Sequence, residues 1–422
     1  MDFKEEILKG REERAKLIND YLKDYSVIIS ITANMPGGDK NIYLSYLLIN
    51  AFSFLVNETA NSDYFYSFNQ DGPFLLIFKK NGNSDKLKKQ MILIEENHEL
   101  GRFIDIDVYD KYNLYFRENK RKCMLCNDLA IRCMRNKKHK EEELISHIEK
   151  NVFDFYSKKF EELIDFSIMG ELNLHPKFGL VTPFSSGSHK DMNYDLMIKA
   201  KEAIIPYYIK ILRQTLITTN LDKDINHLKD IGIQAEKAML QVTGDINAYK
   251  GLIYNLGLLI SAYGYKISRY EVRSVYEISK QIANRLHGDY NYESNSYGDQ
   301  AYRNYKIRGV RGEALSGFVN VQKAIHLLKD FSQENLLITL IYYIINIEDT
   351  SFLKRSVSYN KYQDIKRKFK ELNIKNKAEL EKLNKFCLDN NLSFGGSADL
   401  LVLSIFIKKL NHYLVDLKEK KY

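Results

Sequence analysis

The spacing of apolar residues over the first 150 positions changes repeatedly, which indicates that strands and helices alternate there. Stretches with apolar residues at helical intervals are separated by short β-branched runs, and residues 103–109 alternate apolar with acidic side chains, as a strand does. The pattern predicts an N-terminal α+β domain, residues 1–150, with a small mixed sheet. The expected elements are helices over 4–25, 42–56 and 84–96, and strands over 26–34, 74–78 and 103–109.

From about residue 150 the pattern is helical almost throughout. Apolar residues recur at helical intervals, and glycines fall mostly between the helical segments. We therefore expect an all-α second domain over residues 151–422. The expected helices are 152–168, 194–216, 231–241, 250–262, 269–284, 312–328, 336–345, 378–389 and 398–417.

The low contents of cysteine, proline and tryptophan exclude several classes of protein. The 422 residues include four cysteines, five prolines and no tryptophan, which is unlike a disulfide-rich secreted domain or a collagen. The longest apolar run, residues 336–345, is shorter than the ~20 residues that a bilayer requires, so we expect no membrane association. The first residues, Met-Asp-Phe-Lys-Glu-Glu, form no apolar signal core. We expect a cytoplasmic protein.

Lysine and arginine (63) outnumber aspartate and glutamate (55), which gives a formal charge of +8. A basic balance favours anionic partners such as phosphorylated ligands, nucleic acid or an acidic protein. The alternative is that the charged residues, 28% of the chain, only keep the surface hydrated. The basic runs at 86–89, 135–140 and 366–368 are short, which is typical of hydrated helix faces.

Two carboxylates in the strand over 103–109 suggest chemistry on phosphates. Asp105 and Asp107 are two residues apart, so a strand places them on the same face. Such a pair is costly unless a cation neutralises it, and Mg²⁺ bound to carboxylates and substrate phosphates is a natural choice. The pair could support attack on a phosphate with release of pyrophosphate. The alternative is an edge strand whose hydrated face carries acidic residues.

Three of the four cysteines, Cys123, Cys126 and Cys133, lie close together in the sequence and are followed by His139. Three thiolates and an imidazole can form a tetrahedral zinc site. The spacing is not that of a standard zinc finger, and only one Cys-x-x-Cys pair is present. We therefore favour reduced cysteines that pack as small apolar residues.

The stretch over residues 176–192 combines small residues with groups that bind anions. Backbone N–H groups in such a stretch can approach phosphates, and Lys177 and Lys190 can pair with them. Asp191 could hold a metal ion. His189 could transfer protons or only cap the local turn.

Three glycine turns each precede a helix in the second half of the chain. A glycine turn that opens a helix presents free N–H groups to an anion. The alternative at each turn is an ordinary helix cap, which Ser397 could provide at the last one. Three such turns, each with a charged residue, favour a polyphosphate ligand. The residues concerned are Lys250, Arg311, Glu313, Gly395, Gly396, Ser397 and Asp399.

These stretches together resemble two enzyme families joined in one chain. Residues 11–147 resemble the holo-citrate lyase synthases, which are apo-citrate lyase phosphoribosyl-dephospho-CoA transferases. Residues 165–410 resemble the triphosphoribosyl-dephospho-CoA synthases. The matching stretches are 34–41, 100–108 and 121–139 for the first family, and 176–181, 187–192, 250–259, 311–318 and 395–401 for the second.

The resemblance implies that the chain makes and attaches the prosthetic group of citrate lyase. In the first reaction, the 2′-hydroxyl of 3′-dephospho-CoA attacks the anomeric carbon of ATP, and adenine leaves. In the second, a serine of the acyl carrier protein (γ) subunit of citrate lyase attacks the α-phosphate of the product, and pyrophosphate leaves. The implied ligands are ATP, 3′-dephospho-CoA and Mg²⁺, and no nucleic acid is expected. The +8 charge suits an acidic carrier protein.

The resemblance also implies roles for the residues singled out above. In the first reaction Lys177, His189, Lys190, Lys250, Arg311 and the turn Gly395, Gly396 and Ser397 would bind substrate phosphates, and Asp191, Glu313 and Asp399 would be catalytic. In the second, Asp105 and Asp107 would hold Mg²⁺, and Lys40, Arg102 and Arg121 would neutralise phosphates.

The chain departs from the synthase family at two places. Ala248 and Tyr249 stand where the family has Thr-His, and Ser356 and Val357 stand where it has a glycine pair. These departures put in doubt any role of the missing residues. The alternatives to a bifunctional transferase are a chain that retains only one of the two activities and a basic RNA- or nucleotide-binding protein.

Overall fold

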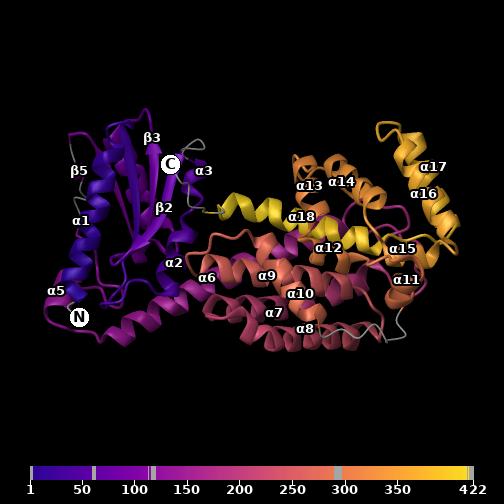
Figure 1. Cartoon of the computed structure of the whole chain (residues 1–422), viewed down its shortest axis with the longest axis horizontal. Coiled ribbons are helices and arrows are strands. Elements are labelled where there is room, and N and C mark those ends of the chain that lie inside the picture. Colours follow the sequence, from indigo (N-terminus) through magenta and orange to yellow (C-terminus); the bar gives the residue numbers. More distant parts are fainter. Residues whose placement is uncertain are drawn as a thin grey trace. The chain divides into compact units, whose positions relative to one another are not determined.

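The computed structural model describes residues 3–58, 63–112, 114–115, 120–288, 297–415 and 417 (Figure 1). The chain divides into two compact units. The sheet unit comprises the described parts of Met1–Lys159, Tyr265–Arg273 and Asn411–Tyr422, and the helical unit comprises those of Phe160–Gly264 and Ser274–Leu410. A domain boundary at residue 150 would fall inside helix α6 (Glu141–Leu172), which continues from one unit into the other. The limits 1–150 and 151–422 stay predictions.

The sheet unit is built on one five-stranded sheet in the order β2-β3-β1-β4-β5. Every strand pairing in the described sheet is antiparallel, so the α+β class is confirmed, but the sheet is not the mixed one expected. The predicted strands correspond to β1, β3 and β4, whereas β2 and β5 were not predicted. The strands are β1 (Val27–Ala33), β2 (Asp63–Asn69), β3 (Gly72–Lys79), β4 (Ile104–Asp110) and β5 (Leu114–Tyr115).

Helices cover the sheet because its strands have apolar side chains on both faces. Ile18 of α1 (Phe3–Tyr21) packs in one cluster with Ile28 of β1 and Phe78 of β3. Helix α2 (Tyr43–Ala51), which is buried along almost its whole length, packs against β1 and β3 as well. Successive residues of a strand point to opposite faces, and the first five residues of β1 are all buried. The unbroken apolar run in β1 therefore indicates a central strand.

Side chains of helix α4 (Ser84–Asn97) form hydrogen bonds with the backbone of β4 outside its short pairing with β5. Strand β5 pairs with β4 only at Val108 and Tyr109 in the described residues. Nearer the start of β4, Lys88 Nζ donates to the Ile106 carbonyl (2.8 Å), and the Ile106 N–H donates to Glu95 Oε1 (2.7 Å). These bonds satisfy backbone groups that a neighbouring strand would otherwise have to pair. Two further helices, α3 (Leu55–Glu58) and α5 (Ala130–Arg135), and the 3₁₀ turn η1 (Gly101–Phe103) complete the unit.

The helical unit confirms the expected all-α class. The predicted helix over 312–328 is interrupted, because Gly317 (φ 80°) and Phe318 (φ 59°) both adopt left-handed backbone conformations. Besides the end of α6, its helices are α7 (Tyr194–Ile217), α8 (Leu221–Thr243), α9 (Lys250–Ile267), α10 (Val275–Gly288), α11 (Tyr297–Tyr305), α12 (Val310–Ser316), α13 (Val319–Leu327), α14 (Gln333–Asn346), α15 (Thr350–Arg355), α16 (Tyr359–Glu371), α17 (Lys377–Asp389) and α18 (Gly395–Tyr413).

Helix α18 forms part of the core of the helical unit. All residues from Leu400 to Ile407 are buried, which is typical of a helix surrounded by other helices. Its polar Ser404 is satisfied by a hydrogen bond with the Tyr343 hydroxyl (2.5 Å). Among the described helices, none combines the length and the apolar character that crossing a membrane would require.

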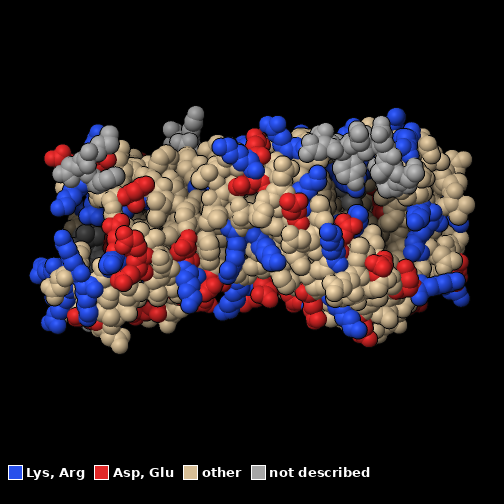
Figure 2. Space-filling model, turned by 90° about the horizontal axis from the view of Figure 1, so that it is seen from below, with Lys and Arg blue, Asp and Glu red and all other residues tan. Residues whose placement is uncertain are grey.

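Basic and acidic side chains are mixed over the face of the molecule that Figure 2 shows. Clusters of lysine and arginine alternate there with clusters of aspartate and glutamate. A nucleic-acid-binding surface would instead concentrate positive charge along one groove or stripe. The charge on this face therefore gives no support to the RNA-binding alternative.

Candidate active sites

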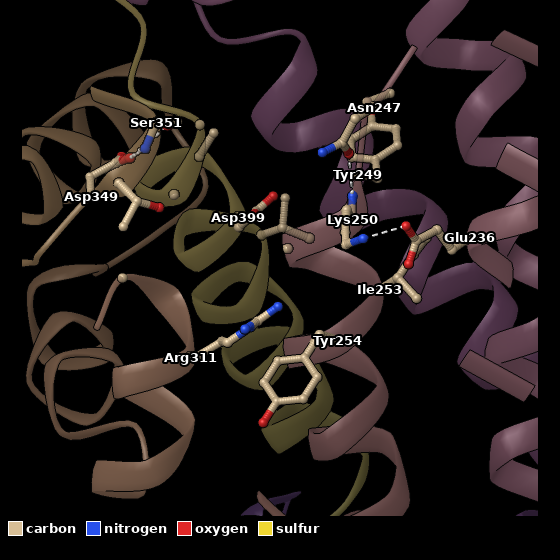
Figure 3. Close-up of a pocket in the computed structure, with 18 of the residues that line it drawn as sticks. Glu236, Asn247, Tyr249, Lys250, Ile253, Tyr254, Arg311, Asp349, Ser351 and Asp399 are labelled. Carbon is tan, nitrogen blue, oxygen red and sulfur yellow. Dashed lines mark hydrogen bonds and ion pairs between the residues drawn. The ribbon is translucent and has the colours of Figure 1, made fainter. Parts of the chain in front are cut away.

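A cavity of about 940 Å³ lies in the helical unit, where several helices begin. The starts of α9, α12, α15 and α18 line it, and Figure 3 shows Lys250, Arg311, Ser351 and Asp399 around it. Small-molecule sites usually measure ~300–1,000 Å³, so this cavity is among the larger ones. Helix N-termini carry partial positive charge. The cavity is therefore suited to a large anionic ligand.

The start of α9 places a cation on the cavity wall. The Lys250 N–H donates to Asn247 Oδ1 (3.1 Å), which caps the helix. The Lys250 ammonium pairs with Glu236 (2.5 Å), as Figure 3 shows, and both side chains are partly exposed. An ion pair that is open to solvent contributes little stability. A substrate phosphate can therefore compete with Glu236 for Lys250.

Asp399, the fifth residue of α18, lines the cavity. Burial raises the pKa of its carboxyl group well above the usual range, and the nearby charges of Asp349 and Glu171 raise that pKa further. A raised pKa favours the protonated form of the carboxyl group. Asp399 can therefore donate a proton to a bound ligand.

Asp349 links the starts of α15 and α18. Its Oδ1 accepts from the N–H groups of Ser351 (3.0 Å) and Phe352 (3.1 Å), which caps α15. Its Oδ2 accepts from the N–H (3.0 Å) and the hydroxyl (3.2 Å) of Ser397. Asp349 is buried and lies on the cavity wall. The sequence did not indicate Asp349 as a site residue, although an aspartate directly before a helix is a usual capping signal.

Lys177 forms a buried ion pair at the cavity. Its ammonium donates to the carbonyl (3.0 Å) and to Oε1 (2.8 Å) of Glu171, and the two side chains are 1% and 4% exposed. Burial lowers the pKa of Lys177, while Glu171 opposes that change. The predicted phosphate role of Lys177 stays a prediction, and its ammonium is already bound to Glu171.

His189 lies between Arg355 and Ser393 on the cavity wall. Arg355 Nη2 donates to His189 Nδ1 (3.1 Å), and an arginine only donates, so Nδ1 accepts. The proton of the neutral ring then lies on Nε2, which donates to Ser393 Oγ (2.9 Å). Burial, followed by the charge of Arg355, lowers the pKa of His189 to about 4. His189 is therefore neutral at pH 7 and orients Ser393.

Tyr249, one of the two departures from the synthase pattern at the start of α9, has a buried polar group at the cavity. The side chain is 4% exposed, and its hydroxyl has no hydrogen-bond partner in the described structure. Burial raises the pKa of Tyr249 well above the usual range, and the charges of Glu171 and Asp399 raise it further. A buried hydroxyl without a partner is costly. A bound ligand or an ordered water would satisfy it.

The other predicted residues of the helical unit divide into two groups. Arg311 lines the cavity, as do Gly395 and Gly396. Glu313, Lys190, Asp191 and Ser397 are not part of the lining. Glu313 is buried and accepts from the Asn320 N–H (3.2 Å) at the start of α13, and burial raises its pKa. Lys354 and Arg355 line the cavity and were not predicted.

The sheet unit confirms that Asp105 and Asp107 belong to one strand and share a face. In β4 they lie opposite Thr32 and Ser30 of β1. Each carboxylate already has a cation: Asp105 Oδ1 is 2.6 Å from Arg121 Nη1, and Asp107 Oδ1 is 3.2 Å from Lys88 Nζ. Burial raises the pKa of Asp105, and Arg121 opposes that rise. Both side chains remain partly exposed.

A second cavity of about 480 Å³ lies beside this strand. It is lined by basic residues, including Arg102 and Arg121, and by acidic residues of α4. Arg121 Nη2 also pairs with buried Glu95 (2.5 Å), which fixes its position. Gly101 is required here because a Cβ would overlap the Glu95 carbonyl oxygen. Lys40 is not part of this lining, and its ammonium donates to the Met35 carbonyl.

The structure also brings together the residues of the predicted but disfavoured zinc site. One ligand atom from each of Cys123, Cys126, Cys133 and His139 lies within 4.8 Å of the others. The carboxylates proposed for the first reaction are Asp191, Glu313 and Asp399. Among the described residues they do not come together as a possible metal site.

Each part of the chain matches a known protein family. Residues 157–417 match the family model described as ATP:dephospho-CoA triphosphoribosyl transferase, and residues 4–155 match that described as apo-citrate lyase phosphoribosyl-dephospho-CoA transferase. A protein of Haemophilus influenzae named CitXG is 29% identical, with 95% of each chain covered. A CitXG of Leuconostoc mesenteroides is also 29% identical, with 96% of each chain covered. The 2-(5″-triphosphoribosyl)-3′-dephosphocoenzyme-A synthase of Haemophilus ducreyi is 30% identical over 68% of this chain and 99% of its own length.

Proposed function

We propose, because the chain belongs to the ATP:dephospho-CoA triphosphoribosyl transferase family, that its helical unit joins ATP to 3′-dephospho-CoA and releases adenine. The sheet unit then transfers the phosphoribosyl-dephospho-CoA group to a serine of the citrate lyase acyl carrier protein, and pyrophosphate leaves. Together the two reactions make and attach the prosthetic group of citrate lyase. Both substrates of the first reaction are intracellular metabolites, which agrees with the predicted cytoplasmic location.

The observation that supports the first reaction most strongly is the position of Asp399, a carboxyl group with a raised pKa on the wall of a cavity that also contains cations. When the 2′-hydroxyl attacks the anomeric carbon of ATP, a C–O bond forms and the bond to adenine breaks. Adenine needs a proton to leave as a neutral base. Asp399 supplies that proton, and its carboxylate then accepts the proton of the attacking hydroxyl. The net reaction consumes no proton.

Lys250 and Arg311 are the cations that we assign to the triphosphate. Both lie on the cavity wall near the start of a helix, and Lys250 forms a partly exposed pair with Glu236. Lys354, which sequence analysis missed, lines the same cavity and is exposed. Cations placed in this way stabilise the charge of bound phosphates.

The test of the first reaction is adenine release from ATP in the presence of dephospho-CoA, followed by mass spectrometry of both products. We expect Asp399→Asn to lower the turnover by ~100-fold or more, the usual contribution of a general acid. Asp389→Asn, an exposed aspartate at the end of α17, is the matched control and should leave turnover unchanged. Full activity of Asp399→Asn would contradict the assignment.

Mg²⁺ is the predicted cofactor of the second reaction, and the residues present fit it. Asp105 and Asp107 share a face, and among the described residues each meets its cation through Oδ1. Their Oδ2 atoms are therefore available to a cation that also binds substrate phosphates. When bound, Mg²⁺ would neutralise the departing pyrophosphate. Arg121 orients Asp105 and, with Arg102, contributes positive charge to the adjacent cavity.

The second reaction is tested with the purified triphosphoribosyl product and the apo carrier protein. We expect Asp105→Asn to abolish transfer while adenine release by the helical unit continues. Asp110→Asn, in the last position of β4, is a control on the same strand. If Asp105→Asn retains full transfer, the role given to the aspartate pair is wrong, whereas loss of adenine release in the same variant would show that the reactions are assigned to the wrong units.

A further inference from the structure

Cys123, Cys126, Cys133 and His139, which we call the cysteine cluster, have the geometry of a tetrahedral metal site. Cys126 Sγ lies 3.5 Å from Cys133 Sγ and 3.4 Å from His139 Nε2, and the four ligand atoms lie within 4.8 Å of one another. A tetrahedral zinc ion with three sulfur ligands and one nitrogen ligand spaces them by about 3.8 Å (S to S) and about 3.6 Å (S to N). The cluster is already close to that arrangement.

The backbone around the first two cysteines forms a tight turn that presents both sulfurs to one side. An isolated antiparallel bridge joins Lys122 to Leu129, and the Cys123 N–H donates to the Asp128 carbonyl (2.7 Å). Within this turn, the Leu125 N–H donates to Cys123 Sγ (3.4 Å). A backbone N–H directed at a sulfur stabilises a thiolate, which is the form that binds metal.

The packing explanation favoured by the sequence does not fit this environment. Cys123, Cys126 and His139 are only partly buried, and only Cys133 is buried. The apolar side chains of α5 do not cover them, since Met134 is 72% and Ile131 42% exposed. Cysteines that serve as apolar packing residues are usually buried among other apolar groups.

The charge around the cluster also suits thiolates. The Lys138 ammonium lies close enough to interact with the sulfurs of Cys126 and Cys133. Lys138 in turn lies 3.7 Å from Asp128, on the turn that holds the first two cysteines. A bound divalent cation and Lys138 together would balance the charge of three thiolates.

We propose that the cysteine cluster binds one structural zinc ion. Three sulfurs and one nitrogen complete a four-coordinate shell and leave no position for a substrate, as in structural rather than catalytic zinc sites. The ion would tie the turn at Cys123 to α5 and to the loop before α6. Arg121 and Lys122 directly precede this turn: Arg121 pairs with Asp105, and the Lys122 carbonyl accepts from Arg102 (2.7 Å). Zinc would therefore hold these groups beside the second cavity.

The experiment measures the metal content of the full chain, purified without a metal-binding tag or chelator, by inductively coupled plasma mass spectrometry. We expect about one zinc ion per chain and a loss of roughly tenfold or more in Cys126→Ser. Cys387→Ser is the matched control, since Cys387 is buried in α17 of the helical unit and should leave the zinc content unchanged.

A second measurement keeps the test decisive if Cys126→Ser fails to fold. His139→Cys supplies a fourth thiolate, so it should retain the ion, and its Co²⁺-substituted form should show stronger thiolate-to-metal charge-transfer absorption than the wild type. Wild-type protein without zinc, with another metal in its place, or with a disulfide between Cys126 and Cys133 would overturn the proposal. Neither the metal content nor the Co²⁺ spectrum depends on the transferase activity.

Discussion

The variant Lys177→Met separates two roles for this lysine. The sequence predicts a phosphate ligand, whereas the structure places the ammonium 2.8 Å from Glu171, with 1% and 4% of the two side chains exposed. Methionine keeps the apolar stem of the side chain but removes the charge and both hydrogen bonds to Glu171. If the pair is structural, the variant loses stability. If Lys177 binds phosphate, the variant loses affinity for ATP and keeps its stability.

The expected loss of stability is large because Glu171 would be left buried without its partner. Removing one member of a buried ion pair costs ~3–5 kcal/mol, against the ~5–15 kcal/mol that usually stabilises a domain.

Urea unfolding followed by circular dichroism measures this loss, and adenine release measures the KM for ATP. The double variant Lys177→Met/Glu171→Gln removes the unpaired charge, so we expect it to recover most of the lost stability. Lys385→Met, an exposed residue of α17, controls for removal of a lysine. A loss below about 1 kcal/mol, the size of a surface pair, would refute the buried-pair reasoning, and so would equal losses in the single and double variants.

Three further results are expected. Adenine release should fall as the pH rises through the raised pKa of Asp399, because only the protonated carboxyl group donates; a rate that does not change up to alkaline pH would exclude Asp399 as the acid. Gly101→Ala should destabilise the sheet unit by ~1–3 kcal/mol and weaken transfer to the carrier protein while adenine release continues, because the added Cβ would overlap the Glu95 carbonyl. Tyr249→Phe should keep or slightly raise thermal stability, since it removes a buried hydroxyl without a partner, and should raise the KM for ATP; an unchanged KM would show that the hydroxyl does not contact the ligand.

Local pattern predicted most of the elements, and its failures have local causes. Strands β1, β3 and β4 were found because each has a run of buried apolar or alternating residues. Strand β2 was missed because it contains no β-branched residue, and the consecutive aromatic residues 64–66 hide the alternation of its side chains. The helix predicted over 312–328 ignored the left-handed conformations of Gly317 and Phe318, and left-handed backbone at a phenylalanine is rare enough that a helical pattern hides it.

The candidate sites were predicted one residue at a time, and their pairings were not. The sequence singled out Lys250, Arg311 and Asp399 because charged residues beside glycine turns are typical of anion sites. It gave no indication that His189 would meet Arg355, 166 positions later. Such pairs depend on which helices pack together, and a single sequence contains no direct signal for that.

At the start of α18, one helix N–H group that could bind an anion already has a carboxylate partner from the same chain. The glycine turn was interpreted as an anion site because the first N–H groups of a helix lack partners within it. The structure does place a carboxylate there, but it is Asp349 of the same chain, which accepts from the N–H and hydroxyl of Ser397. Asp349 also caps α15, so one buried side chain joins two helix N-termini. Its negative charge raises the pKa of Asp399, which lies two residues after Ser397. Asp349 thus favours the protonated form of the proposed acid.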